Sequence, residues 1–206
     1  MKTKLCALSV GVALALAGTA AFAGSTATTN QFGFANDANV NQKYNANADA
    51  YIGQTGSLNQ GEITQNFTHG NTDATINQNG FSNKATAYQA STWGANSDIS
   101  QTGAGNHAKT DQTYGFGQDA KIVQVGFGNH ATATQTGNTN ADASIAQYGT
   151  SNVATSTQKY GFNQDATIYQ VGALNNAMVA QTGSYLTSHQ TQVGTANHSV
   201  VTQVGF

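Results

Sequence analysis

Acidic residues recur at one position of a repeating pattern. Asp49, Asp73, Asp119, Asp142 and Asp165 each stand five residues before a glutamine. If the repeats stack, their carboxylates form a column, which could bind a row of cations or supply the acid and base of a glycosidase. No second carboxylate is placed to work with any of them. We therefore interpret Asp73, Asp119, Asp142 and Asp165 as solvated gatekeepers whose like charges slow self-association.

Basic and aromatic side chains also recur in step. Lys84, His107, His130 and His198 occupy one position of the second half of a repeat, where Val153 and Asn176 interrupt the row. Imidazoles are metal ligands, but the interrupted row favours solvent-facing side chains, so we expect no metal site, no cofactor and no enzyme activity. Protonation of these histidines near pH 6 would add positive charge along one edge, and we hypothesise that it changes the rate of self-association.

Aromatic residues fall between the repeats. Tyr114 and Phe116 recur 46 residues later as Tyr160 and Phe162. A platform for a carbohydrate or a dye is one interpretation. We expect packing at the corners of the fold instead, because aromatic rings bury large apolar areas.

Glutamine gives the strongest signal, because it recurs every 11 to 13 residues. The series is Gln31, Gln42, Gln54, Gln65, Gln78, Gln89, Gln101, Gln112, Gln124, Gln135, Gln147, Gln158, Gln170, Gln181, Gln192 and Gln203. Asparagines precede the second glutamine of several repeats, namely Asn83, Asn106, Asn129 and Asn152. The series has a period of about 23 residues with two similar halves, and a fixed period of this size is typical of a repeat architecture.

The elements that position these amides are short strands. The first half of a repeat reads D-A-x-I-x-Q-x-G, as in 73–80, and the second reads N-x-A-x-x-x-Q, as in 83–89. Alanine, an aliphatic residue and glutamine are two residues apart, so they share one face of a strand. The aliphatic position of the first halves is always isoleucine in the six central repeats: Ile52, Ile76, Ile99, Ile122, Ile145 and Ile168.

Glycine and asparagine between the halves predict tight turns, because both tolerate positive φ. The extra residue between Gln65 and Gln78 predicts an insertion in the loop His69–Thr72. Two short strands bury little by themselves, but coils wound on one another give two facing parallel sheets. We therefore predict an all-β fold: a two-sheet parallel β-solenoid of about eight 23-residue coils.

Inward amides fit such a core only when they are paired. A glutamine stacked on the same glutamine one coil above and below can form a ladder, as in cross-β fibres, whereas an unpaired buried amide is costly. The sequence shows no capping helix or charge cluster beside the first or last coil, and unpaired strand edges are templates for another chain. We expect both ends to stack head to tail, and the ladder residues to mediate self-assembly.

Composition supports this interpretation. Charged residues make up 8% of the chain and proline is absent, although a typical globular protein has about 25% charged residues. Proline cannot donate a hydrogen bond to a β-ladder, so its absence suits a chain made of strands. Without Lys2 and Lys4 the chain has five lysines, no arginine and nine acids, a formal charge of −4. A chain with this charge does not favour nucleic acid as a partner.

Residues 1–23 resemble a secretory signal peptide. Lys2 and Lys4 precede an apolar stretch, 5–17, and Ala21-Phe22-Ala23 matches a small-residue cleavage site. We expect cleavage after Ala23, which removes the sole cysteine, Cys6. The predicted organisation is a signal peptide at 1–23, a short polar leader at 24–30 and a repeat domain at 31–206, in a secreted protein.

The pattern Q-x-G-x-x-N-x-A-x-x-x-Q, seen at Gln101–Gln112 and in most other coils, resembles the curlin repeat of curli subunits. The resemblance implies an extracellular functional amyloid of a bacterial biofilm matrix, formed as a cell-surface fibre that promotes adhesion and aggregation. It also implies export through an outer-membrane pore, a nucleator subunit as partner, and contact with host or abiotic surfaces. The chain departs from the family where curlin repeats usually carry serine: it has Ala48, Thr72, Ala95, Gln118, Ala141 and Gln164.

We expect a major-type subunit whose principal partner is another copy of itself. A minor, nucleator-type subunit is the first alternative. A monomeric solenoid serving as an adhesin or an ice-binding surface is the second, and Thr132-x-Thr134 and Thr155-x-Thr157 resemble ice-binding rows. A β-helix enzyme acting on carbohydrate ranks last, because no acidic cluster converges.

Overall fold

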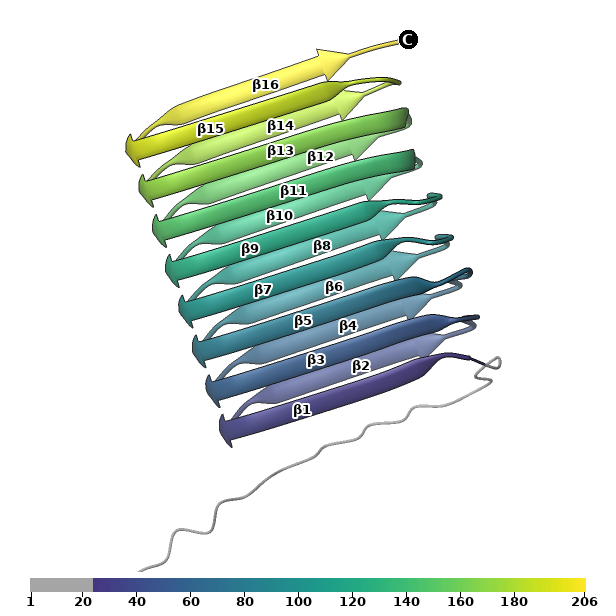
Figure 1. Cartoon of the computed structure of the whole chain (residues 1–206), viewed down its shortest axis with the longest axis vertical. Coiled ribbons are helices and arrows are strands. Elements are labelled where there is room, and N and C mark those ends of the chain that lie inside the picture. The colour runs from purple at the N-terminus through teal and green to yellow at the C-terminus, as the bar shows by residue number, and fades with distance from the viewer. Residues whose placement is uncertain (1–23) are drawn as a thin grey trace, which may run out of the picture.

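The computed structural model describes residues 24–206, which form a stack of strand pairs with the two strands of each pair in facing sheets (Figure 1). The predicted signal peptide lies outside the described residues. All sixteen strands of the described region pair in parallel, and sheet order follows alternate strands. The predicted fold, an all-β two-sheet parallel solenoid of eight coils, is confirmed.

The odd sheet carries the first strand of each coil: β1 (Thr26–Phe34), β3 (Ala48–Ser57), β5 (Thr72–Phe81), β7 (Asn96–Ala104), β9 (Asp119–Phe127), β11 (Thr139–Thr150), β13 (Phe162–Ala173) and β15 (Thr187–Thr195). The even sheet carries the second: β2 (Asp37–Lys43), β4 (Gln60–Asn66), β6 (Lys84–Ala90), β8 (His107–Thr113), β10 (His130–Thr136), β12 (Val153–Lys159), β14 (Asn176–Thr182) and β16 (His198–Val204).

The first strand begins earlier than the sequence suggested. Thr26 pairs with Asp49 and Gln31 with Gln54 in one unbroken register between β1 and β3. The predicted polar leader 24–30 is therefore largely part of the solenoid. Alternation in β1 is hard to recognise because its inward positions, Ala27 and Thr29, are small or polar.

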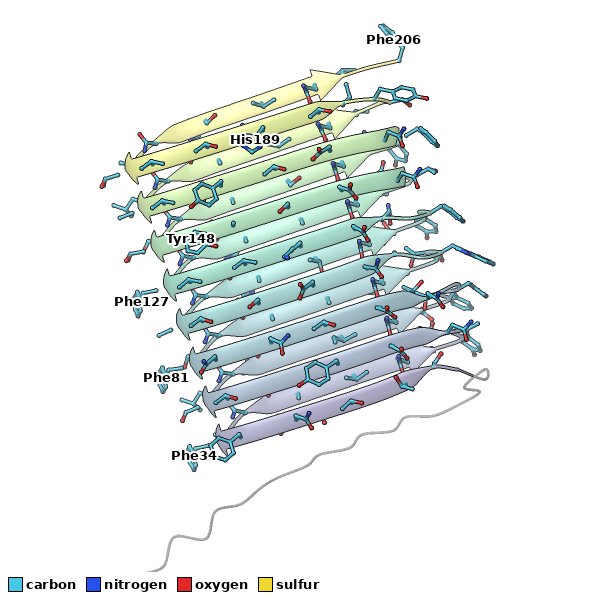
Figure 2. The ribbon with its side chains drawn as sticks, viewed as in Figure 1. Phe34, Phe81, Phe127, Tyr148, His189 and Phe206 are labelled. Atoms are coloured by element: carbon cyan, nitrogen blue, oxygen red, sulfur yellow. The ribbon has the colours of Figure 1, made fainter. Side chains whose placement is uncertain are left out.

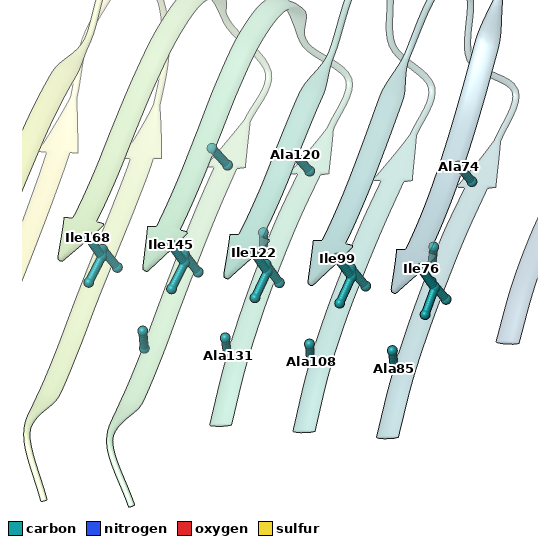
Figure 3. Packing of buried hydrophobic residues seen from close by; sticks show 14 of the residues in the cluster. Ala74, Ile76, Ala85, Ile99, Ala108, Ala120, Ile122, Ala131, Ile145 and Ile168 are labelled. Carbon is teal, nitrogen blue, oxygen red and sulfur yellow. The ribbon is translucent and has the colours of Figure 1, made fainter. Parts of the chain in front are cut away.

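Strict register keeps like residues on top of one another. Ile52 pairs with Ile76 and Gln54 with Gln78, and the same correspondence continues up the sheet. The six predicted isoleucines are fully buried and belong to one cluster with alanines of both sheets. Figure 3 shows this packing from Ile76 to Ile168. A one-residue slip would turn this entire face outward, so the apolar core fixes the register.

Turns between the strands of a coil depend on a column of glycines. The glycine two residues after each odd-sheet glutamine adopts φ between 111° and 130°, from Gly33 to Gly194. A Cβ on Gly126 would overlap the carbonyl oxygen of Gly149 in the next coil. These glycines are thus required by both φ and the close approach of backbones.

The turn asparagines behave differently from the prediction. Asn106, Asn129 and Asn152 point inward and do not adopt positive φ; the residue before each of them does. That preceding position holds a non-glycine in several coils, such as Leu58 and Leu174. In the other turn, the predicted insertion falls within His69–Thr72, where Gly70 and Asn71 both have positive φ.

Candidate self-assembly site

Two glutamine ladders run the length of the solenoid, one in each sheet. In each, the side-chain Nε2 donates to Oε1 of the glutamine in the next coil, over 2.7–3.0 Å from Gln31 to Gln192 and from Gln42 to Gln203. The glutamines of each ladder are therefore hydrogen-bonded in the order in which they occur in the sequence. The structure brings all sixteen predicted glutamines into these columns; their role in self-assembly stays a prediction.

The second hydrogen of each amide sets the orientation of the ladder. Gln124 Nε2 also donates to the backbone carbonyl of His107 at 3.0 Å, and Gln112 Nε2 to that of Gln118 at 3.0 Å. An amide turned over would place its oxygen against a carbonyl oxygen. Backbone carbonyls across the core therefore hold Nε2 of every ladder glutamine except Gln31 in place, and each ladder points from the N-terminal coil to the C-terminal coil.

An asparagine ladder runs in the opposite direction. Asn106 Oδ1 accepts from both the backbone N and Nδ2 of Asn129, each at 3.1 Å. Asn129 Nδ2 also donates to Gly149 O at 2.9 Å. The predicted asparagines are all in this column, and so are four that the prediction omitted: Asn36, Asn59, Asn175 and Asn197. Every member lies six residues before an even-sheet glutamine, which is the signal that identifies the whole set.

The end coils expose these ladders. Inward glutamines of the central coils are 0–2% exposed, whereas Gln31, Gln42 and Gln203 are half-exposed. Within residues 24–206, no donor reaches Oε1 of Gln31 or Gln42, and no donor reaches Oδ1 of Asn197. One end of the stack therefore presents glutamine acceptors, and the other presents glutamine donors and an asparagine acceptor.

The predicted gatekeeper acids form an exposed column on the odd sheet. Asp49 pairs with Asp73, and Asp119, Asp142 and Asp165 are consecutive. Partial burial, followed by repulsion from Asp119 and Asp165, raises the pKa of Asp142. Burial and Asp49 likewise raise that of Asp73. Neighbouring carboxylates of this column therefore repel one another.

The basic column of the even sheet contains one close pair. His107 and His130 are neighbours in register, with Lys84 beside His107 and Val153 beside His130. Partial burial, then His130 and Lys84, lower the pKa of His107. His198 pairs with Asn176 and stands apart.

Aromatic side chains line the two edges where the turns lie. Phe34, Phe81 and Phe127 follow one edge, pointing outward (Figure 2). On the other edge, Trp93 stacks between His69 and Phe116, with centroids 5.8 and 6.4 Å apart. Tyr114 and Tyr160 are about 70% exposed. Corner packing is confirmed for Phe116 and Phe162, which pack against Trp93 and Tyr185. The rings lie at the surface, because the alanine and amide columns leave no room for them inside.

No cluster of three or more metal-ligating side chains occurs among residues 24–206. In the same region no helix of the length and apolarity of a membrane span was found.

The fold and the ladders together define a class of protein: parallel β-solenoids whose coils are joined by stacked side-chain amides. The family model described as the curlin associated repeat matches residues 139–172, which cover β11, the turn after it, β12 and most of β13. This match supports a curlin-family assignment. A comparison with curated proteins found no match.

Proposed function

We propose that the chain is a secreted structural subunit of curli-like extracellular fibres and that it assembles by stacking its last coil on the first coil of the next copy. The observation that carries the proposal is the complementarity of the two end coils. Gln192 and Gln203 keep an Nε2 hydrogen beyond their bonds to Asn176 O and Thr187 O. Gln31 and Gln42 offer Oε1 at the other end.

Head-to-tail stacking satisfies all three ladders at once. Gln192 would donate to Gln31 of the next copy and Gln203 to its Gln42, while Asn36 of that copy would donate to Asn197. The free hydrogen of Gln31 would reach the carbonyl of His198, the position that Asp37 fills for Gln54 within the chain. Stacking two like ends would oppose donor to donor, so a heterologous contact that continues into a filament is favoured.

Other features support a fibre rather than a monomeric adhesin. The outer strands β1, β2, β15 and β16 leave backbone groups unpaired, and such edges recruit further strands. A match to the curlin repeat favours the same class. Biofilm, adhesion, surface-binding and cell-surface roles follow from this assignment as proposals, with the outer-membrane pore and nucleator as proposed partners.

The test uses purified residues 24–206. We expect fibres that bind thioflavin and show a meridional reflection near 4.7–4.8 Å. Polymerisation without seeds indicates a major-type subunit, and polymerisation only with seeds indicates a dependent one. A chain that stays monomeric for days at high concentration contradicts the fibre proposal.

A sharper test changes one atom type at the interface. Gln203→Glu replaces the outgoing donor by an oxygen that faces Gln42 Oε1 of the next copy. Gln60→Glu is the matched control, because Gln60 is exposed on the outer face and gains the same charge. We expect Gln203→Glu to slow elongation at least about tenfold, with Gln60→Glu near wild type. Equal rates for the two variants would exclude this interface.

A further inference from the structure

His107 and His130 form a pair unlike any other histidines in the described chain. They are the first residues of β8 and β10 and lie one above the other, with ring centroids 4.6 Å apart and planes inclined by 21°. Their Nδ1 atoms are 3.0 Å apart. We propose that this pair is a two-imidazole binding site for a divalent transition-metal ion, with Cu(II) the favoured ion.

The two imidazole rings can offer nitrogen lone pairs to a metal ion. One ring must carry its proton on Nδ1 to make the contact, and a shift to the Nε2–H tautomer frees both Nδ1 lone pairs. Both rings are at least partly exposed, so each can rotate outward with the Nδ1 atoms kept 3.0 Å apart, which turns both lone pairs toward one ion while water completes its coordination.

Spacing selects the geometry. Two metal–nitrogen bonds of about 2.0–2.1 Å that span 3.0 Å subtend roughly 91–97°. That angle is close to the right angle between neighbouring ligands of a tetragonal site and below the tetrahedral angle. Tetragonal nitrogen sites favour Cu(II) or Ni(II), and Cu(II) binds most strongly in the first-row series.

Neighbouring residues leave this side of the pair open. Val153 flanks His130 and offers no ligand, and Lys84 flanks His107 as a cation. The next outward residue of β8, Lys109, is bound to Asp111 at 3.2 Å, so that carboxylate is engaged elsewhere. The site is therefore a two-nitrogen chelate, of modest affinity, and one per chain.

Folding creates the pair. The two histidines are 23 residues apart in sequence and meet only because β8 and β10 are in register. A metal held by both stabilises the solenoid over the unfolded chain, in proportion to its preference for the folded state. This inference concerns a single chain and does not depend on fibre formation.

The test titrates CuCl2 into folded residues 24–206 in the presence of glycine as competitor, with binding followed by calorimetry and Cu(II) electron paramagnetic resonance. We expect one site per chain with hyperfine coupling to two imidazole nitrogens. His107→Asn and His130→Asn should each weaken binding by roughly 100-fold, because each removes the chelate advantage. His69→Asn, His189→Asn and His198→Asn are matched controls and should bind as wild type does.

Several results would overturn the proposal. One is unchanged affinity in either His107→Asn or His130→Asn. Another is an equal loss in all five variants, which would indicate scattered single-histidine binding. A third is full affinity in guanidinium-unfolded chain, where the pair does not exist. Circular dichroism of each variant establishes that the fold is intact, so that loss of binding reports the site.

Discussion

At the scale of single residues, direction is the main property of the amides. A glutamine in this core donates twice and accepts once, and the backbone carbonyl that takes the second hydrogen decides which way the side chain faces. The ladders repeat the same hydrogen bond from coil to coil. Here they are also polar, because every coil repeats the same donor and acceptor assignment.

Removing one rung should be costly. Gln124→Ala deletes a fully buried side chain and leaves Gln101 Nε2, Gln147 Oε1 and the His107 carbonyl without their partner. We expect the free energy of unfolding to fall by about 2–4 kcal/mol, measured as a lower guanidinium midpoint. Gln60→Ala, on the exposed face, should change it little. Similar losses for both variants would mean that the ladder hydrogen bonds contribute nothing to the free energy of unfolding.

The paired histidines predict a pH dependence. Because burial, His130 and Lys84 lower the pKa of His107, the unfolded chain binds more protons than the folded one below pH of about 6.5. Above that pH, protonation of His107 takes nothing from the free energy of unfolding. As the pH falls through about 6.5, the free energy of unfolding should decline. The groups that face the pair are Lys84 and, along β8, the Lys109–Asp111 ion pair. Guanidinium midpoints from pH 7.5 to 5 check this.

His107→Asn should remove the decline in stability, because asparagine does not titrate. If the decline survives in His107→Asn, another group causes it.

The acidic column has the opposite sign: the raised pKa of Asp142 means that the folded chain binds more protons than the unfolded chain, so stability rises as the pH falls toward about 4. Asp142→Asn should therefore flatten the pH dependence of stability on the acidic side and raise stability at neutral pH.

At the scale of the coil, glycine positions are not equivalent. Gly126 combines a φ of 130° with a backbone oxygen where a Cβ would stand, whereas Gly105 has a φ of 64° and open space around it. Leu58 and Ser82 occupy the position of Gly105 in other coils. The two sites thus separate steric exclusion from conformational preference.

Gly126→Ala should destabilise the fold by about 3 kcal/mol or more, because the backbones of adjacent coils must separate. Gly105→Ala should cost only about 1–2 kcal/mol, the ordinary cost of a left-handed residue. Chemical denaturation of both variants under one condition measures the difference. Equal costs would show that the glycine column yields to a methyl group.

One coil contains an evident compromise. Gln118 is fully buried with neither amide atom paired, and its side chain fills the space that Gly115 leaves. In the next coil, Asn138 and Ala141 occupy the positions of Gly115 and Gln118. Asn138 is fully paired there: it donates to Gln158 O at 2.8 Å and accepts from Gly161 N. The sequence pattern alone does not reveal the mismatch, because Gln118 is simply another amide.

Exchanging one solution for the other should stabilise the protein. Gly115→Asn with Gln118→Ala copies the Asn138 and Ala141 arrangement, and the φ of Gly115 is not positive, so asparagine fits there without strain. We expect a gain on the order of 1 kcal/mol from the removal of two unsatisfied atoms, seen as a higher guanidinium midpoint. The single variant Gln118→Ala, which leaves a cavity, should not show this gain.

At the scale of the whole molecule, polarity of the ladders makes the two ends of a fibre chemically different. A Gln203→Glu chain keeps its first coil intact and can join the donor end of a fibre, but it then presents the wrong atom to the next copy. Small amounts should therefore poison growth at that end alone. Two-colour fluorescence microscopy of seeded fibres measures this as growth that becomes one-sided, and symmetric slowing would contradict the assigned direction.

The amino-acid sequence by itself determined the architecture. Glutamine, isoleucine and alanine recur with periods of two and of about 23 residues, and only a register that stacks like on like keeps amides paired and isoleucines buried. Strand faces, sheet number and coil number follow from that constraint. The curlin resemblance followed from the same spacing.

Tertiary structure decided what depends on atoms brought across the core. The direction of each ladder rests on which carbonyl lies within reach of Nε2, and the closeness of His107 to His130 rests on ring orientation within a shared register. The start of β1 at Thr26 and the left-handed Leu58 rest on pairing to an adjacent coil, not on local preference. Spacing along a chain encodes which residues meet, whereas hydrogen-bond direction and ring contact exist only after they have met.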